Sequence, residues 1–155
     1  MKATSPSTIK SLALAGLIGE IAFEAYAWLI SPILFDVSLQ PSKLVMALTK
    51  IFTGLDIPYG VAFVLHFLIG AFGFASVVLL FKHFTKLSHV ASGFAAGVLL
   101  WFVAQGVLAP VVGRSFMMGF GSYTQSSFVG HVGMCVLMAF LWQQFMNRSR
   151  AAAAL

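Results

Sequence analysis

A chain of 155 residues in which 60% of the residues are hydrophobic and 8% are charged has too little polar surface to cover a water-soluble core. The mean hydropathy of +0.98 indicates a membrane protein, and the length leaves room for about four helices of roughly 20 residues and for no second domain. Nine Lys and Arg against four Asp and Glu give a net charge of +5, which we attribute to membrane topology rather than to a nucleic-acid surface.

Four long apolar runs follow one another along the chain, and each is long enough to cross about 30 Å of hydrocarbon as a helix. Helix is required because each span must satisfy its own backbone polar groups, and the strict alternation of a lipid-facing barrel strand is absent. The sequence therefore predicts a single all-α membrane domain. It is an up-down bundle of four transmembrane helices over residues 9–34, 60–81, 90–111 and 128–146.

A shorter amphipathic segment separates the first two spans. Within residues 41–54, Pro41 suits the first helical position and Gly54 suits the end of a helix. We expect this helix to lie on the outer, extracytoplasmic membrane surface or to cap the bundle. Its apolar stripe consists of Leu44, Val45, Leu48, Ile51, Phe52 and Leu55.

Most cations of the chain gather on one side of the four-span arrangement. Cytoplasmic loops of membrane proteins carry an excess of Lys and Arg, so this side is expected to be cytoplasmic. The chain is therefore predicted to be a multi-pass protein of the bacterial inner membrane with both termini in the cytoplasm. The six cations concerned are Lys2, Lys10, Lys82, Lys86, Arg148 and Arg150.

Polar residues inside the spans need a reason, because an ionisable group there costs about 3 kcal/mol on insertion scales. Glu24, His66, Gln105 and His131 each lie 14 to 16 residues from the cytoplasmic end of their span, which is about 21 to 24 Å at a rise of 1.5 Å per residue. One residue from each helix is thus expected in a common layer. Glu20 lies one turn deeper than Glu24 on the same helix face.

Three chemistries can use this layer. The first is a b-type haem held between His66 and His131, since imidazoles are strong iron ligands and spans 2 and 4 lie diagonally in an up-down bundle. The second is a transition-metal ion bound by His66, His131 and Glu24, with Glu20 or Gln105 assisting. The third is a proton or small-ion relay through Glu20 and Glu24 that needs no cofactor.

Structural explanations compete with each of these. Glycines in spans chiefly let helices pack closely, so Gly70 near His66 and Gly130 near His131 either leave room for a porphyrin or mediate packing. The two buried glutamates are equally compatible with a neutral, hydrogen-bonded structural role, and a lone Gln in a span often bonds a neighbouring helix. Arg114, just beyond the third span, is expected to bind an anion or a quinone headgroup or to anchor the span at lipid phosphates.

The second half of the chain contains motifs that resemble a known family. The run FTKLSHVASGFAAG at residues 84–97, continuing through Gln105 to Pro110, and the Gly-His pair at residues 130–131 before the basic end QFMNR at 144–148 are similar to the YagU-like bacterial inner-membrane proteins. The resemblance covers about residues 65–148 and carries over His66, Gln105 and His131. It implies a small multi-span protein associated with acid tolerance and no particular cofactor. Glu20 and Glu24 have no counterpart in that pattern.

The main hypothesis is a small inner-membrane protein that binds haem b or a transition-metal ion for electron transfer with a membrane quinone or a partner subunit. The alternatives are proton or small-ion transport linked to acid tolerance, and a cofactor-free accessory subunit of a larger membrane complex or homo-oligomer. No phosphate-binding loop, Ser-His-Asp set or HExxH motif is present, so no catalytic residue is predicted. The candidate ligands are His66, His131 and Glu24, with Glu20, Gln105 and Arg114 in support.

Overall fold

The computed structural model describes residues 6–152, and these residues are almost entirely helical, with no strand among them. Within this part of the chain, four helical segments are long and apolar enough to cross a membrane: Ser7–Phe35, Tyr59–Thr85, His89–Val111 and Ser122–Ala152, called spans 1 to 4 below. The prediction of four apolar helices is confirmed. Lys2, one of the cations assigned to the cytoplasmic side, lies outside the described residues.

Each of the first three spans combines α-helical and π-helical winding. The π-helix is rare and occurs frequently at functional sites. Here η1 begins directly after the turn that carries Glu24, η2 begins shortly after His66, and η3 contains Gln105. The elements in chain order are α1 (Pro6–Ala25), η1 (Tyr26–Ile30), α2 (Ser31–Phe35), α3 (Pro41–Thr53), α4 (Tyr59–Leu68), η2 (Ile69–Phe74), α5 (Ala75–Thr85), α6 (His89–Phe102), η3 (Val103–Leu108), α7 (Ala109–Val111), η4 (Phe116–Phe120) and α8 (Ser122–Ala152).

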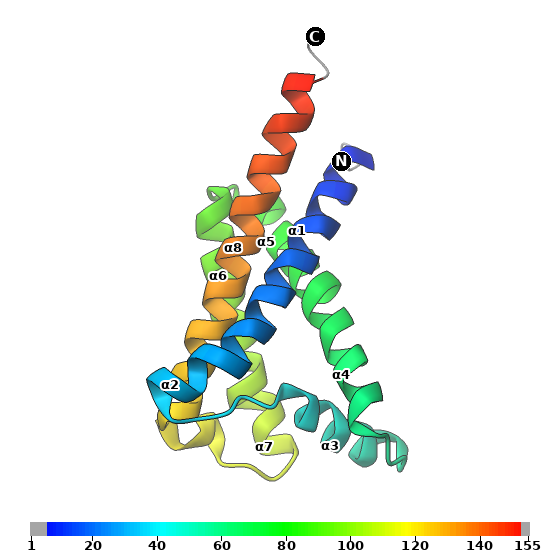
Figure 1. The fold of residues 1–155 in the computed structure, drawn as a ribbon, viewed down its shortest axis with the longest axis vertical. Coiled ribbons are helices and arrows are strands. Elements are labelled where there is room, and N and C mark those ends of the chain that lie inside the picture. Colours follow the sequence, from blue (N-terminus) through cyan, green and yellow to red (C-terminus); the bar gives the residue numbers. More distant parts are fainter. Residues whose placement is uncertain (1–5, 153–155) are drawn as a thin grey trace.

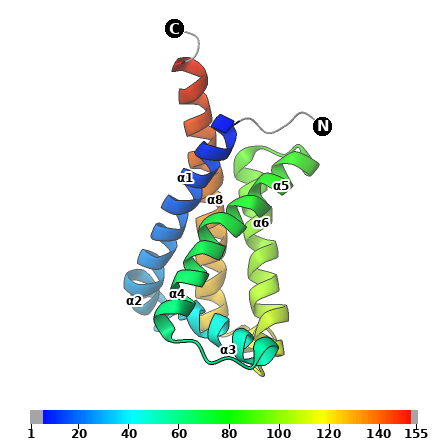
Figure 2. The same cartoon turned by 90° about the vertical axis from the view of Figure 1, so that its right-hand side faces the viewer.

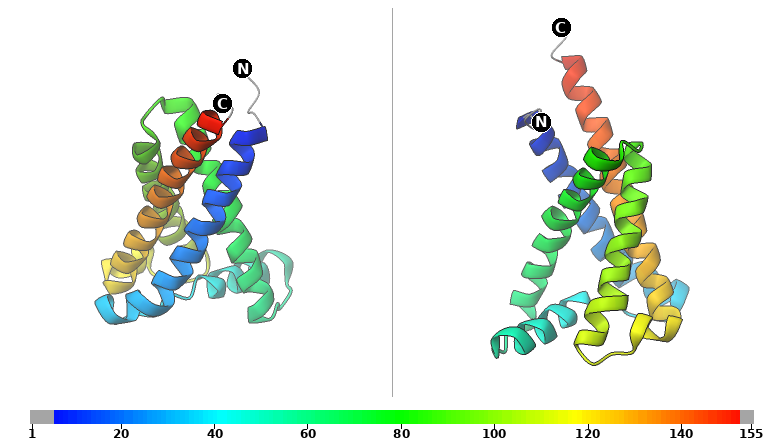
Figure 3. Two further views of the ribbon diagram at one scale, coloured as in Figure 1. Left: turned by 45° about the horizontal axis from the view of Figure 1, so that its top comes forward. Right: turned by 180° about the vertical axis from the view of Figure 1, so that it is seen from behind.

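The four spans form an up-down bundle (Figures 1 and 2). Span 1 packs mainly on spans 2 and 4, and span 3 also packs on spans 2 and 4, so spans 2 and 4 face each other across the bundle. The start of α1 and the end of α8 lie at one end, and α3 lies across the opposite end between α4 and α7 (Figure 1). The spans lie closest together near the α5–α6 turn and spread apart toward α3 (Figure 3).

The predicted amphipathic helix between spans 1 and 2 is confirmed as α3. Pro41 occupies its first turn, and Gly54 ends it in the left-handed conformation at φ 74°, which a residue without a side chain adopts without strain. The apolar stripe is divided between two environments. Leu44, Val45 and Leu48 face a pocket inside the bundle, whereas Ile51 and Phe52 are exposed.

Spans 3 and 4 have the most extensive contact of any two spans in residues 6–152. A side-chain carbon at Gly97 would lie 2.6 Å from the Cα atom of Val132 and 2.9 Å from the carbonyl oxygen of His131, so the backbones approach each other at this glycine. Ala96 and Ala139 are fully buried nearby. Small residues of this kind allow close helix contact in membrane proteins.

The helix that contains the predicted fourth span, residues 128–146, is longer than that span, because α8 begins at Ser122 and continues to Ala152. Its first turns are polar in sequence yet buried in the fold. Ser126 exchanges hydrogen bonds with the hydroxyls of Tyr26 and Ser31 at 2.8 and 2.6 Å, and Ser127 accepts one from Gln105. A hydropathy scale scores these serines as polar, which favours exposure. In the fold their hydroxyls form hydrogen bonds inside the bundle, so they are buried.

Candidate functional site

Three of the predicted polar residues meet where span 1 packs on span 2. His66 Nδ1 lies 3.3 Å from Glu20 Oε1 and 3.4 Å from Glu24 Oε1. The Glu20 side chain is 0% exposed, and the side chains of His66 and Glu24 are largely buried. One potential ligand atom from each residue lies within 4.8 Å of the others. We call Glu20, Glu24 and His66 the Glu–His cluster.

The helix geometry brings this cluster together. Glu20 and Glu24 are one turn apart on α1, so both carboxyls project toward span 2, where His66 lies on α4. Gly70, one turn after His66, provides the space: a side-chain carbon at Gly70 would overlap the Glu20 carboxyl group. The room that the sequence attributed to a porphyrin or to packing is therefore filled by a carboxyl group of the protein.

Four polar atoms of the Glu–His cluster have no hydrogen-bond partner in residues 6–152. Among the described residues, neither oxygen of Glu20 has a hydrogen-bond partner, and the same is true of Glu24 Oε1 and His66 Nδ1. The separations of 3.3 and 3.4 Å exceed the usual 2.7 to 3.2 Å of an N–H···O bond. Trp28 Nε1 donates to Glu24 Oε2 at 2.9 Å, which orients this carboxyl group and leaves Oε1 facing His66.

The donor atoms have the spacing of metal ligands. Bonds of 2.0 to 2.2 Å from a tetrahedral ion to nitrogen or oxygen place neighbouring ligand atoms about 3.3 to 3.6 Å apart. Two of the separations in the Glu–His cluster fall in this range, and a mixed set of one imidazole and two carboxylates suits zinc, iron or manganese. The structure differs from the predicted ligand set in one member, because Glu20 takes the place that the sequence assigned to His131.

His131 belongs to a second polar group, between spans 3 and 4. Its Nδ1 lies 2.8 Å from the carbonyl oxygen of Ser127, and the hydroxyl of Ser127 accepts a hydrogen bond of 3.0 Å from Gln105 Nε2. Because a carbonyl oxygen only accepts, Nδ1 carries the hydrogen of this bond. We call Gln105, Ser127 and His131 the span 3–4 network.

An aromatic ring contacts both histidines. The ring centroid of Phe23 lies 5.9 Å from that of His66 and 5.9 Å from that of His131. The same ring fills the space beside Gly130, where a side-chain carbon would lie 2.7 Å from it. A porphyrin between the two histidines therefore requires the Phe23 side chain to move, which makes the haem form of the hypothesis less compatible with this arrangement than the metal form.

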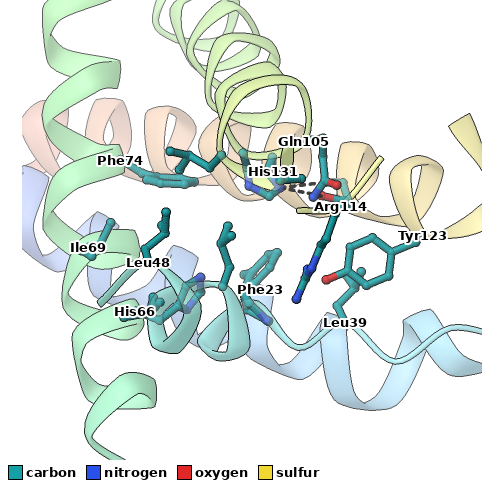
Figure 4. A pocket seen from close by; sticks show the side chains of 17 residues that line it. Phe23, Leu39, Leu48, His66, Ile69, Phe74, Gln105, Arg114, Tyr123 and His131 are labelled. Atoms are coloured by element: carbon teal, nitrogen blue, oxygen red, sulfur yellow. Dashed lines mark hydrogen bonds between the residues drawn. The ribbon is translucent and has the colours of Figure 1, made fainter. Parts of the chain in front are cut away.

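A pocket of about 140 Å³ lies beside both polar groups, beneath α3 (Figure 4). Most of its walls are apolar, and Leu44 and Leu48 contribute from α3. Arg114, which the sequence placed just beyond span 3, extends into the pocket (Figure 4). The polar residues that line it are His66, Gln105, Arg114, Tyr123, Ser127 and His131.

No family model, curated protein or solved structure matches this chain. The similarity to the YagU-like proteins therefore stays a prediction that rests on the sequence motifs within residues 65–148.

Sequence reasoning missed three residues that shape the site. Trp28 lies four residues after Glu24, and Ser127 lies four residues before His131, so each forms a hydrogen bond along one helix face. This spacing is visible in the sequence and could have identified both partners. Phe23 had no comparable signal, because only the packing of spans 1, 2 and 4 brings its ring to both histidines.

Proposed function

We propose that this protein holds one transition-metal ion inside the membrane at the Glu–His cluster and that it serves electron transfer. The observation that carries the proposal is the buried carboxyl group of Glu20. Its two oxygens have no hydrogen-bond partner among the described residues, and its Oε1 lies at ligand spacing from His66 Nδ1. A buried carboxyl group without hydrogen bonds is costly in an apolar medium, and metal coordination removes that cost.

Each residue has a distinct task in this proposal. Glu20 and Glu24 supply two negative charges that balance a divalent ion, and His66 supplies a nitrogen ligand. Trp28 holds Glu24 in place, as the hydrogen-bonding partners of ligands commonly do. Bound iron or manganese would change oxidation state and serve electron transfer, whereas zinc would not.

We also propose a bacterial inner-membrane location with both termini in the cytoplasm. The start of α1 and the end of α8 lie at the same end of the bundle as the α5–α6 turn (Figures 1 and 2). The described cations Lys10, Lys82, Lys86, Arg148 and Arg150 all belong to these segments, which supports a cytoplasmic position for that end and an extracytoplasmic position for α3.

Metal analysis of the purified protein tests the proposal. After growth with added zinc, iron or manganese, we expect about one ion per chain in the parent protein and less than a tenth of that in the Glu20→Gln, Glu24→Gln double variant. Asp56→Asn, which changes an exposed carboxylate paired with Lys50, is the matched control and should keep the full content. An unchanged ion content in the double variant would falsify the metal site. A Soret absorption band lost in His66→Ala and His131→Ala would instead support haem.

A second candidate is proton movement through the two glutamates. It is favoured by the position of His66, which contacts both carboxyl groups and also lines the pocket beneath α3, so that it links the buried pair to that space. Vesicles reconstituted with Glu24→Gln should then carry a markedly smaller proton flux than vesicles with the parent chain. Equal fluxes would remove this candidate and leave the metal site untouched.

A further inference from the structure

The pocket beneath α3 has the composition of a site for a small amphiphile. Its walls are mainly apolar and a few polar groups converge on it, which is the usual composition of a ligand pocket. Its volume of about 140 Å³ is close to the roughly 150 Å³ of a protein cavity that holds benzene. The rings of Phe23 and Phe74 lie beside it (Figure 4). The pocket therefore suits one six-membered ring, with the apolar residues of α3 available to a tail.

Gln105 indicates which kind of polar group the ring of the ligand needs. The residue is 6% exposed, and its Nε2 donates to Ser127, but its Oε1 has no partner among the described residues. A buried acceptor without a partner is unfavourable, so the pocket demands a ligand that donates a hydrogen bond. His131 adds a second acceptor: because Nδ1 carries the hydrogen toward Ser127, the neutral ring has its lone pair at Nε2.

Arg114, in contrast, requires a ligand that accepts a hydrogen bond. Its guanidinium group only donates hydrogen bonds, and it extends into the same pocket (Figure 4). A ring with two oxygens, at least one of them a hydroxyl, meets both demands, because one hydroxyl donates to Gln105 and the other oxygen accepts from Arg114. An ionised fatty acid would satisfy Arg114 alone. An oxidised quinone has no hydrogen to donate to Gln105.

We propose that this pocket binds a membrane hydroquinone, the reduced form of a quinone with an apolar tail. Gln105 accepts from one hydroxyl group and Arg114 donates to the opposite oxygen. The proposal concerns binding alone and goes beyond the proposed metal site, with which the pocket shares His66.

Binding of two matched probes to the full chain in lipid nanodiscs tests the proposal. The probes are a decyl-substituted benzohydroquinone, kept under anaerobic conditions, and its dimethyl ether, which has the same ring and tail but no hydrogen to donate. We expect the parent chain to bind the hydroquinone about tenfold more tightly than the ether, since one hydrogen bond is lost. Equal affinities would overturn the proposal, and this comparison needs no variant.

Gln105→Leu then locates the acceptor. It should bind the two probes equally, whereas Gln125→Leu, which changes an exposed glutamine bonded to the carbonyl of Phe120, should keep the tenfold preference. A preference that persists in Gln105→Leu would contradict the assignment. A fatty acid that binds more tightly than the hydroquinone and is released by Arg114→Gln but not by Gln105→Leu would overturn it in favour of a carboxylate.

The same measurement on chelator-treated protein and on the Glu20→Gln, Glu24→Gln double variant separates this inference from the metal site. Hydroquinone binding should stay within about twofold of the parent value in both. Loss of binding in both would contradict the hydroquinone site as an independent site, whereas loss of metal with hydroquinone binding retained would leave it intact.

Discussion

The two polar groups of this protein contribute residues to the same pocket but differ in how their hydrogen bonds are met. In the span 3–4 network, Gln105 donates to Ser127 and Ser127 accepts from His131, so one helix pair satisfies most of its own polar atoms. In the Glu–His cluster, buried ligand atoms of all three residues have no such partner among the described residues.

The two groups are therefore suited to different tasks. A network that satisfies itself joins two helices and orients its free atoms, which here are Gln105 Oε1 and the Nε2 atom of His131. A cluster of unsatisfied charged groups is stable only with an ion or a proton added. The membrane depth that the sequence predicts for these residues does not distinguish the two groups. The presence or absence of a hydrogen-bond partner for each polar atom does distinguish them.

The greatest loss of stability is expected from a variant that pushes spans 3 and 4 apart. Gly97→Ala places a methyl group against backbone atoms of Val132, and backbone atoms cannot rotate away as a side chain can. We therefore expect a loss of about 3 kcal/mol of unfolding free energy. Unfolding in mixed micelles measures it. Gly133→Ala, where nothing lies within 4 Å of the added carbon, is the control and should cost less than about 0.5 kcal/mol. Equal stability of the two variants would contradict the close contact.

A smaller effect is expected where spans 1 and 2 enclose Glu20. Gly70→Ala should destabilise the protein by about 2 kcal/mol, because the methyl group displaces the Glu20 carboxyl group, whose side chain can partly move. It should also lower metal content, which Gly97→Ala should not do per folded molecule. Gly73→Ala, whose added carbon has Ile69 Cγ2 at 3.7 Å as its nearest neighbour, is the control. Full metal content in Gly70→Ala would argue against Glu20 as a ligand.

Removing the hydrogen bond that orients Glu24 should lower the affinity for the metal ion rather than the stability of the fold. Trp28→Phe keeps an aromatic ring and deletes the donor to Glu24, so we expect metal affinity to fall about tenfold. Trp101→Phe deletes the corresponding donor to the carbonyl of Thr124, near the span 3–4 network, and should leave metal affinity unchanged. Competition with a chelator of known affinity measures both. A shift of the same size in the two variants would contradict a specific role for Trp28.

The smallest effect tests the span 3–4 network itself. Ser127→Ala removes the acceptor of Gln105 and should cost about 1 kcal/mol of unfolding free energy without loss of metal. Ser76→Ala removes an exposed hydroxyl that bonds the carbonyl of Phe72 in its own helix, and it should change stability by less than about 0.5 kcal/mol. If metal content fell with Ser127→Ala, the two polar groups would be coupled.

Periodicity and spacing predicted much of this architecture. The four spans and α3 followed from apolar runs and from the turn residues Pro41 and Gly54, because these signals are local. The start of α8 did not follow, since Ser126 and Ser127 are polar in sequence and become buried only by bonding Tyr26 and Gln105 from other helices. The contact of Glu24 with His66 agrees with their predicted common depth, but depth alone could not tell which side of each helix faces which neighbour.

Composition and periodicity were enough to indicate four apolar helices suited to a membrane and the few ionisable residues within them, because the transfer of apolar and ionisable groups into a membrane depends on residue type. Which of these polar residues contact one another depends on the tertiary structure. The rotation of span 1 against span 2 brings Glu20 onto Gly70 and His66, and the close contact of spans 3 and 4 brings Gln105 to Ser127. These pairings depend on helix rotation and interhelical distance, which side-chain packing determines.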